Sequence, residues 1–468
     1  MFRSSKIQTG LWPRQGANKE EILSMIKERM GNTVDWGTTP VCGFPSMAPD
    51  EVGLEVFGLV QAYHPNAILC HTLSEGEKGF SGVQDLEREV VYMTAELLGV
   101  QDPVKDIDGY IAPGGTECNI EGIWIGRDVL LKKIPDPADR RIAILASPAI
   151  HYSVEKACII TDVGVGKWQE CEVTDPLKEK NLMKKYVPLE NGRGMHLVKS
   201  NDIGQIDTNQ LDIKIRQLFN DKGIRRFIIV LNEGTTLTGA MDNTQEVGQL
   251  VSRLREEWSG QAEFYIHVDA AYGAFIYPFL DPEGIWGFRV PEVDSLTADP
   301  YKMGKCPMAE GIFLCRKGLM NDIIRETGYV NSQKDTTLCG SRSGAYAAAC
   351  WATFHNVRFD GFQAIHRDSA GRAQTLFAQI QDQIPKIVAL SQELNMVTLV
   401  LPSDLGKETL DNIKTKIIDP YCLMWDWFTP DPEGLSSLPR KLVKFNITPD
   451  VKNEWLDEII QLFKEILV

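Results

Sequence analysis

Long apolar runs are absent from this sequence. No stretch approaches the roughly 18 consecutive apolar residues that a membrane-spanning helix needs. The opening segment, MFRSSKIQTGLWPRQG, also lacks the apolar core of a secretory signal. We therefore expect a cytoplasmic protein that does not insert into membranes.

Basic residues are fewer than acidic residues in this sequence. The 468 residues include 49 Lys and Arg against 64 Asp and Glu, which gives a formal net charge of −15. A field of that sign repels a polyanion. The composition therefore argues against nucleic acid as a partner.

Paired cysteines are also lacking. The 10 cysteines are scattered, and none forms a CxxC motif or stands at a metal-ligand spacing from a histidine. This pattern disfavours both a disulfide framework and a structural zinc site. We expect reduced thiols and no bound metal.

What the sequence does contain is a regular alternation of short apolar runs and longer helical patterns. From Gly109 onward, runs such as RIAILAS, RFIIVLNEG and EFYIHVDAA are each followed by a helical segment. The alternation predicts an α/β fold with a mostly parallel central sheet and flanking helices. Ligands bind beyond the carboxyl ends of such strands, so the polar residues after each run are the candidates for a site.

The C-terminal part of the chain has a different pattern. Strand-like runs, NMVTLVLP and KLVKFNI, precede an amphipathic closing helix, which predicts a smaller α+β domain. We therefore expect an N-terminal arm over residues 1–75, a large ligand-binding domain over 76–320, and a loop followed by the small domain over 321–468.

The first strand end, APGGTECN, has the composition of a phosphate-binding turn. Gly114 and Gly115 allow backbone N–H groups to approach an anion, and Thr116 adds a hydroxyl. The helix that follows directs its positive end towards the same point. An ordinary turn can have the same composition.

Further strand ends carry polar side chains. His151, in HYSVEKA, could cap a helix or stack on a flat ligand, and Thr236, in NEGTTLTG, offers a hydroxyl. Asp269, in IHVDAAYG, ends an apolar strand, where a carboxylate needs a partner such as a protonated pyridine nitrogen or an arginine. The small side chain of Ala271 would leave room for an aromatic ring.

Lys302 follows the last of these runs, in SLTADPYKMGK, between Pro300 and Gly304. A lone lysine is usually a surface residue. A phosphate site, a histidine, an acid for a ring nitrogen and a lysine on one sheet are, however, the parts that hold pyridoxal phosphate, whose aldehyde forms a Schiff base with lysine. The combination predicts this cofactor.

Together these motifs resemble a known family. HYSVEKA, HVDAAYG and DPYKMG, supported by GGTE and GTT, make the chain similar to the group II pyridoxal-phosphate amino-acid decarboxylases, which include the aromatic amino-acid and archaeal tyrosine decarboxylases. The resemblance runs from about His71 to Gly344. It implies fold type I of the pyridoxal-phosphate-dependent transferases and α-decarboxylation of an L-amino acid to an amine and carbon dioxide. It also implies an obligate homodimer with shared active sites.

The resemblance implies roles for individual residues. Lys302 would form the Schiff base, Asp269 would pair with the ring nitrogen, and His151 would stack on the ring. Gly340 and Ser341, in GSRSG, would help complete the phosphate site of the neighbouring subunit. The full set of implied cofactor contacts is Gly114, Gly115, Thr116, His151, Ser153, Thr236, Asp269, Ala271, Asp299, Tyr301, Lys302, Gly340 and Ser341.

Substrate contacts follow from the same resemblance. Tyr329, in ETGYVNSQKDTT, matches the tyrosine of a mobile loop that would return a proton to the product carbon. His71, Thr72 and Phe80 would line the substrate pocket. Because no arginine pair for a side-chain carboxylate is evident, we expect an aromatic or other uncharged substrate side chain.

One residue departs from the family pattern. Most relatives have histidine directly before the Schiff-base lysine, where this chain has Tyr301. A tyrosine hydroxyl can donate a hydrogen bond but carries no positive charge near neutral pH. The exchange bears on substrate identity and efficiency more than on cofactor binding.

Three alternatives to decarboxylation stay open from the sequence. GFSGVQDLEREVVYMT and the TAD before the lysine also fit a carbon–carbon lyase of the sphingosine-phosphate lyase type. A second alternative is another fold-type-I activity, such as transamination or desulfuration. A third is an inactive cofactor-binding or scaffold protein, against which the intact Lys302, Asp269 and His151 argue.

Overall fold

The computed structural model describes residues 17–31, 33–73, 76–171, 183–326, 328–329 and 334–467. The chain divides into a short N-terminal unit, up to Thr39, and a large unit from Pro40 onward. In the described part of the chain, none of the helices has the length and apolarity to cross a membrane.

The N-terminal unit contains helix α1, Lys19–Met30. Asn18 and Glu21 form a reciprocal capping box at its start. None of the α1 residues is buried. The large apolar side chains on this helix that are about half exposed are Ile22, Leu23, Met25, Ile26 and Met30.

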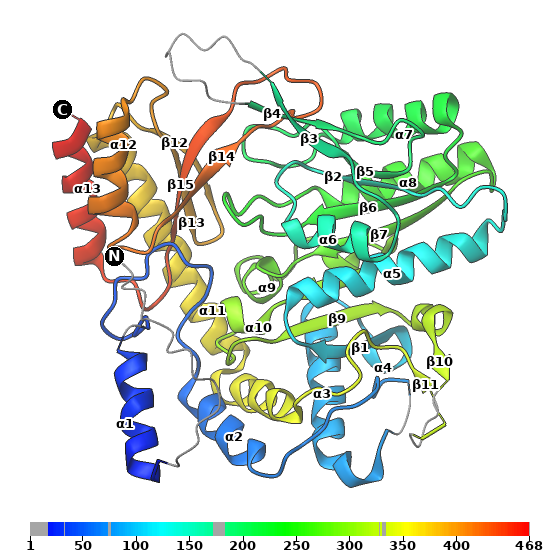
Figure 1. Ribbon diagram of the computed structural model, residues 1–468, viewed down its shortest axis with the longest axis horizontal. Helices are drawn as coiled ribbons and strands as arrows, with labels where there is room; N and C mark the ends of the chain where they lie inside the picture. The colour runs from blue at the N-terminus through cyan, green and yellow to red at the C-terminus, as the bar shows by residue number, and fades with distance from the viewer. Residues whose placement is uncertain are drawn as a thin grey trace. The chain divides into compact units, whose positions relative to one another are not determined.

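The large unit is built on a seven-stranded sheet with the order β1-β9-β8-β7-β6-β2-β5 in the described part of the chain (Figure 1). These strands are β1 Ile107–Ala112, β2 Ala143–Ala146, β5 Gly194–Leu197, β6 Arg226–Asn232, β7 Glu263–Asp269, β8 Val293–Ala298 and β9 Gly311–Arg316. Strand β9 is antiparallel to both of its neighbours, and the other pairings are parallel. The predicted mostly parallel α/β sheet is confirmed.

Both faces of the sheet are covered, because successive strand residues point to opposite sides and both sets are apolar. Along β6, Phe227 and Ile229 join the core on one face, whereas Ile228 and Val230 join the core on the other. The first core includes residues of α3 Ser81–Leu97, α7 Thr208–Lys222 and α8 Thr244–Trp258, and the second includes residues of α5 Gly115–Lys133 and α6 Tyr152–Ile160.

The parallel arrangement brings the carboxyl ends of several strands to one edge of the sheet. Gly114 follows β1, His151 follows β2, Asp269 is the last residue of β7, and Lys302 follows β8. Residues far apart in the sequence therefore converge, as the alternating pattern predicts.

The predicted smaller C-terminal α+β domain is also confirmed. Helix α11, Gly344–Gln383, leads into it and is interrupted at Arg358, whose φ of 59° and ψ of 168° are not helical. The sheet of this domain has the order β12-β13-β15-β14, and its strands and helices share a separate apolar core. Its elements are β12 Val388–Glu393, β13 Met396–Val400, α12 Lys407–Ile413, β14 Met424–Phe428, β15 Arg440–Asn446 and α13 Asn453–Leu467.

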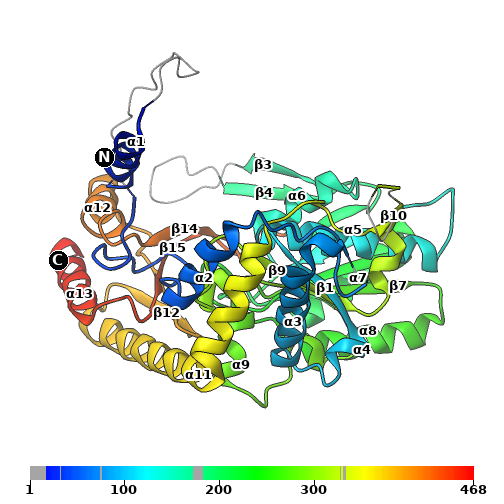
Figure 2. The same cartoon turned by 90° about the horizontal axis from the view of Figure 1, so that it is seen from below.

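Helix α2, Glu51–Gln61, packs along α11 (Figure 2). The remaining short elements are η1 Lys78–Phe80, α4 Pro103–Asp106, β3 Lys167–Cys171, β4 Met183–Val187, η2 Gly273–Phe275, α9 Tyr277–Leu280, η3 Gly287–Arg289, α10 Pro300–Met303, η4 Leu319–Ile323, β10 Arg325–Glu326, β11 Lys334–Asp335 and η5 Lys414–Ile418.

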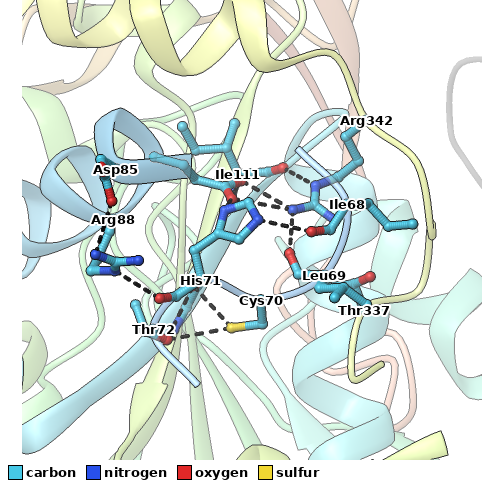
Figure 3. A network of polar contacts seen from close by, with 12 residues as sticks. Ile68, Leu69, Cys70, His71, Thr72, Asp85, Arg88, Ile111, Thr337 and Arg342 are labelled. Carbon is cyan, nitrogen blue, oxygen red and sulfur yellow. Dashed lines mark hydrogen bonds and ion pairs between the residues drawn. The ribbon is translucent and has the colours of Figure 1, made fainter. Parts of the chain in front are cut away.

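A buried ion-pair network joins α3 to the segment before α11 (Figure 3). The Glu87 carboxylate accepts from Arg342 Nη2 at 3.1 Å and from the Ile111 amide at 2.9 Å. Arg342 also donates to the carbonyls of Ile111 and Leu69, each at 2.8 Å. Because both charged groups are almost fully buried, each depends on the other for compensation.

The same network holds two residues for which we predict substrate contacts. His71 Nδ1 is paired with Glu87, and its Nε2 lies 2.8 Å from the carbonyl oxygen of Ile68. Thr72 Oγ1 accepts from the Gly109 amide at 3.0 Å. Both ring nitrogens of His71 are therefore engaged within the protein, and the substrate contacts of His71 and Thr72 stay predictions.

We expect Glu87→Gln to lower the free energy of unfolding by about 3–5 kcal/mol at pH 7, because it leaves the Arg342 guanidinium buried without a countercharge. Burial opposes ionisation of Glu87, but the Arg342 charge, the interactions with His71 and the hydrogen bond from Ile111 together lower its pKa. A lowered carboxyl pKa stabilises the folded state above the unfolded pKa of about 4.3, and that contribution is lost as the pH falls. The difference between wild type and variant should therefore shrink below about pH 4, as measured by urea unfolding at several pH values.

Glu96→Gln is the matched control, since Glu96 is an exposed residue of the same helix. Its effect should stay within about 0.5 kcal/mol. A Glu87→Gln protein as stable as the wild type at pH 7 would contradict the stabilising role of the network.

Candidate active site

The N-terminus of α5 forms one wall of the candidate site. Gly114 caps this helix with a φ of 105°, a conformation that favours glycine, and a Cβ at this position would meet no atom within 4 Å. A Cβ on Gly115 would lie only 2.7 Å from a carboxyl oxygen of Asp299. The open space over Gly114 and the free N–H groups of a first helical turn suit an anionic group, and the segment that carries Lys302 lies directly beside them.

Lys302 is paired with Asp299. Its Nζ lies 3.0 Å from Asp299 Oδ2, and the two side chains are 17% and 2% exposed. Burial lowers the pKa of Lys302, but the charges of Asp299, Tyr301 and Asp269 and the hydrogen bond to Asp299 together raise it to about 12. Burial raises the pKa of Asp299 to about 6. The lysine is therefore cationic near neutral pH and must give up a proton before it can act as a nucleophile.

Tyr301 also belongs to this group. Burial, and next the Asp299 charge, raise the pKa of its phenol to about 12, so that Tyr301 stays neutral. Its hydroxyl is hydrogen-bonded to Asp299, and its carbonyl accepts from Ser46 Oγ at 2.7 Å. Tyr301 thus places a neutral group beside the carboxyl, where a histidine could have carried charge.

A second set of hydrogen bonds joins His151 to Asp269. His151 caps α6, and its Nδ1 lies 2.7 Å from Ser153 Oγ. Burial lowers the pKa of His151, so that the ring is neutral near pH 7 and its face can stack on a flat ligand. Ser153 Oγ accepts from Asn119 Nδ2 at 2.8 Å.

Asn119 is a central residue of the site that the sequence reasoning missed. Its Nδ2 also donates to Asp269 Oδ2 at 2.8 Å, and its Oδ1 accepts from Thr297 Oγ1 at 2.8 Å and lies 2.9 Å from His267 Nε2. One amide side chain therefore connects α5, α6, β7 and β8. The signal in the sequence was a polar residue one turn into an otherwise buried helix, in TECNIEG.

Asp269 has only neutral partners among the described residues. Besides Asn119, its carboxylate accepts from the Ala271 amide at 3.2 Å, and it is 7% exposed. The predicted arginine alternative is not seen, since no ion pair involves Asp269 in the ranges that the structure describes. A buried carboxylate without a countercharge is suited to a cationic ligand group such as a pyridinium.

Lys444 is a second site residue that the sequence reasoning missed. It lies on β15 of the C-terminal domain and is fully buried. Burial, and next the charge of Lys302, lower its pKa to about 7. Its Nζ lies 3.7 Å from Met424 Sδ. A lysine inside the apolar run KLVKFNI was the available signal.

The other predicted residues are less closely connected. Thr116 and Thr236 are half-buried after β1 and β6, and Ala271 is buried after β7. Tyr329 is 90% exposed, and Gly340 and Ser341 are exposed. Phe80 is half-buried at the end of η1, and Ser341 Oγ accepts from Asn66. In the described ranges, the hydrogen bonds and ion pairs of Tyr329, Gly340, Ser341 and Phe80 do not reach Lys302 or Asp269.

Comparisons with known proteins agree with this geometry. The family described as "Pyridoxal-dependent decarboxylase conserved domain" matches residues 81–401. The tryptophan decarboxylase of Clostridium sporogenes is 29% identical over 392 residues, which cover 81% of this chain and 84% of that protein. A probable L-tyrosine/L-aspartate decarboxylase of Methanocella arvoryzae is 27% identical over 400 residues, covering 84% of this chain and 87% of the relative. Neither the lyase nor the scaffold alternative is favoured by these relatives.

The fold comparison gives the same class. The structure of a glutamate decarboxylase from Lactobacillus brevis superposes with a TM-score of 0.77 at 16% identity and covers 97% of this chain and 93% of that one. At this identity the likeness shows the fold alone, and it confirms fold type I.

The residues of the site fit pyridoxal phosphate. The first turn of α5 suits the phosphate, the uncompensated Asp269 carboxylate suits a protonated ring nitrogen, and Lys302 supplies an amine for the aldehyde. The chain belongs to the pyridoxal-dependent decarboxylase family and is a carboxy-lyase that uses pyridoxal phosphate.

Proposed function

We propose that this enzyme removes the α-carboxyl group of an L-amino acid with an aromatic or other uncharged side chain, releasing an amine and carbon dioxide. The observation that carries the proposal is the convergence of Lys302, Asp269 and the α5 N-terminus at one edge of the sheet. The relatives named above support an amino-acid substrate: one is a tryptophan decarboxylase, and the other is named for both tyrosine and aspartate.

The cofactor-holding roles follow from the contacts in the site. Gly114, Gly115 and Thr116 would hold the phosphate with backbone N–H groups and a hydroxyl. Asp269 would keep a proton on the ring nitrogen, and Asn119 would fix the orientation of Asp269. These residues would hold pyridoxal phosphate, which would supply an electron sink for the pair left by the departing carboxylate.

The proton and charge balance rests on this chain's own side chains. Asp299 would stabilise the protonated Lys302 amine whenever that amine is not linked to the cofactor. The neutral Tyr301 would keep its hydrogen bond to Asp299 in both states. Tyr329 would return a proton to the product carbon after carbon dioxide leaves, and closure over the site would exclude water.

We further propose that the active enzyme is a homodimer with active sites shared between subunits, as the resemblance implies. The half-exposed apolar side chains of α1 support this proposal, because an apolar helix surface of that kind is commonly covered by a second chain. A single-chain mass in light scattering of active enzyme would contradict it.

The substrate proposal is tested by measuring carbon dioxide release from each of the twenty amino acids. We expect the highest kcat/KM for tryptophan, tyrosine or another uncharged side chain, because no arginine pair for a side-chain carboxylate is evident in the sequence. Preference for aspartate or glutamate would contradict the substrate class, and no release from any of them would contradict decarboxylation.

The role of Lys302 is tested by Lys302→Arg, which keeps a cation beside Asp299 but removes the amine that links to the cofactor. The variant should lose both amine production and the visible absorption of the covalently linked cofactor. Lys305→Arg, three residues later, should keep both. A Lys302→Arg protein that retains the absorption band would contradict this role.

The role of Tyr329 is tested by Tyr329→Phe, which removes only the hydroxyl. Because the side chain is 90% exposed, the thermal stability should not change, whereas kcat should fall by about 10²–10⁴-fold if the phenol delivers the proton. Tyr63→Phe, at an exposed tyrosine of another segment, is the control. Full amine production by Tyr329→Phe would show that another group supplies the proton.

A further inference from the structure

Two buried cysteines and a buried glutamate meet at a point that decarboxylation does not require. Cys306 follows α10, Glu310 directly precedes β9, and Cys350 lies on α11. They are 2%, 0% and 0% exposed, and one ligand atom of each lies within 4.8 Å of the other two. Three segments of the chain thus bring metal-ligand side chains together inside the protein.

The carboxyl group of Glu310 is not compensated by the protein. Its Oε2 contacts Cys350 Sγ, whereas its Oε1 is buried without a hydrogen-bond partner. No lysine, arginine or histidine forms an ion pair with it in the described ranges. A buried polar atom left in this way costs about 1–3 kcal/mol, so a ligand that satisfied it would stabilise the fold.

Thr353 adds a fourth polar atom. It lies one turn after Cys350 on α11, so both side chains are on the same face of the helix. Its hydroxyl is fully buried, interacts with the Cys306 thiol, and has no hydrogen-bond acceptor of its own. Gly53 of α2 closes the other side, where a Cβ would lie 2.2 Å from Thr353 Oγ1. Two thiols and a carboxyl group therefore lie together, and the Thr353 hydroxyl is next to one of these thiols.

The chemistry of this set selects a particular class of cation. Magnesium and calcium prefer sites built from oxygen ligands alone, and iron–sulfur clusters are usually held by four cysteines. Zinc is bound tetrahedrally by thiolates and carboxylates, with Zn–S distances of about 2.3 Å, which place two ligand sulfurs about 3.8 Å apart. The three ligand atoms lie within 4.8 Å of one another, a limit that includes this sulfur–sulfur separation.

We propose that Cys306, Glu310 and Cys350, with Thr353 or a water molecule as fourth ligand, form a structural zinc site. Binding would release the protons of the two thiols and of the carboxyl group, and the resulting three negative charges would compensate the cation. The expectation from cysteine spacing, that no metal is bound, is thereby revised, because the ligands come from residues that only the fold brings together.

The zinc site would stabilise the backbone next to Lys302. Cys306 lies four residues after the lysine, and its amide donates to the Pro300 carbonyl at 3.2 Å. Zinc would join the segment after α10 to α11 and so fix the backbone that positions Lys302. The role is structural and independent of the proposed substrate.

The test uses full-length enzyme with its cofactor, purified under reducing conditions without chelator. Wild type should contain about one zinc per chain by mass spectrometry of the elements. After removal by a chelator, the thermal midpoint should fall and zinc should restore it. Titration of the stripped protein with Cd²⁺ should produce the ultraviolet charge-transfer absorption of a cadmium–thiolate bond.

Matched variants locate the site. The zinc content per chain should be at least tenfold lower in Cys350→Ser and in the nearly isosteric Glu310→Gln than in the wild type. Cys158→Ser, at a buried cysteine of α6, should keep the zinc content of the wild type. The cofactor absorption and circular dichroism check that each variant is folded. A folded wild type that binds neither Zn²⁺ nor Cd²⁺, or binding that survives both Cys350→Ser and Cys306→Ser, would overturn the proposal, whatever the result of the amino-acid panel.

Discussion

The side-chain amide of Asn119 is the interaction on which the site depends. It ties Ser153 of α6, Asp269 of β7 and Thr297 of β8 to a single residue of α5. An amide can do this because it offers two donors and an acceptor in one plane. Losing it would free the Asp269 carboxylate to turn, and it would leave several buried polar groups without partners.

The neighbour of Asn119 shows how tightly this region is constrained. His267 lies 2.8 Å from Ser295 Oγ through Nδ1 and 2.9 Å from Asn119 Oδ1 through Nε2, and burial lowers its pKa to about 4. The His267 ring is therefore neutral. Because the amide oxygen of Asn119 can only accept, the ring nitrogen that faces it, Nε2, must carry the proton. A Cβ on Gly122 would lie 2.4 Å from this ring, so that only glycine lets α5 approach the sheet closely enough for Asn119 to reach it.

Much of this architecture could be predicted from the sequence, because it depends on local patterns. Periodicity predicts the parallel strands and the smaller C-terminal domain. The polar residues at the strand ends predict where the site lies. Asn119 was missed because it lies inside a helix. Lys444 was missed because it belongs to a strand of the C-terminal domain, far from Lys302 in the sequence. Likewise, nothing local in the sequence shows that Glu87 is paired with the ring of His71.

Three buried acids differ in the partners that the protein gives them. Glu87 is ionised against Arg342, and Asp299 is paired with Lys302 and hydrogen-bonded to Tyr301. Glu310 has thiols instead of a cation, in a core position where a neutral carboxyl group or a metal ion are the two physical solutions. Asp299 faces the side-chain amine of Lys302 at 3.0 Å, whereas the backbone of the same segment is held by other contacts, such as the Lys302 carbonyl, which accepts from the Met47 amide at 3.1 Å.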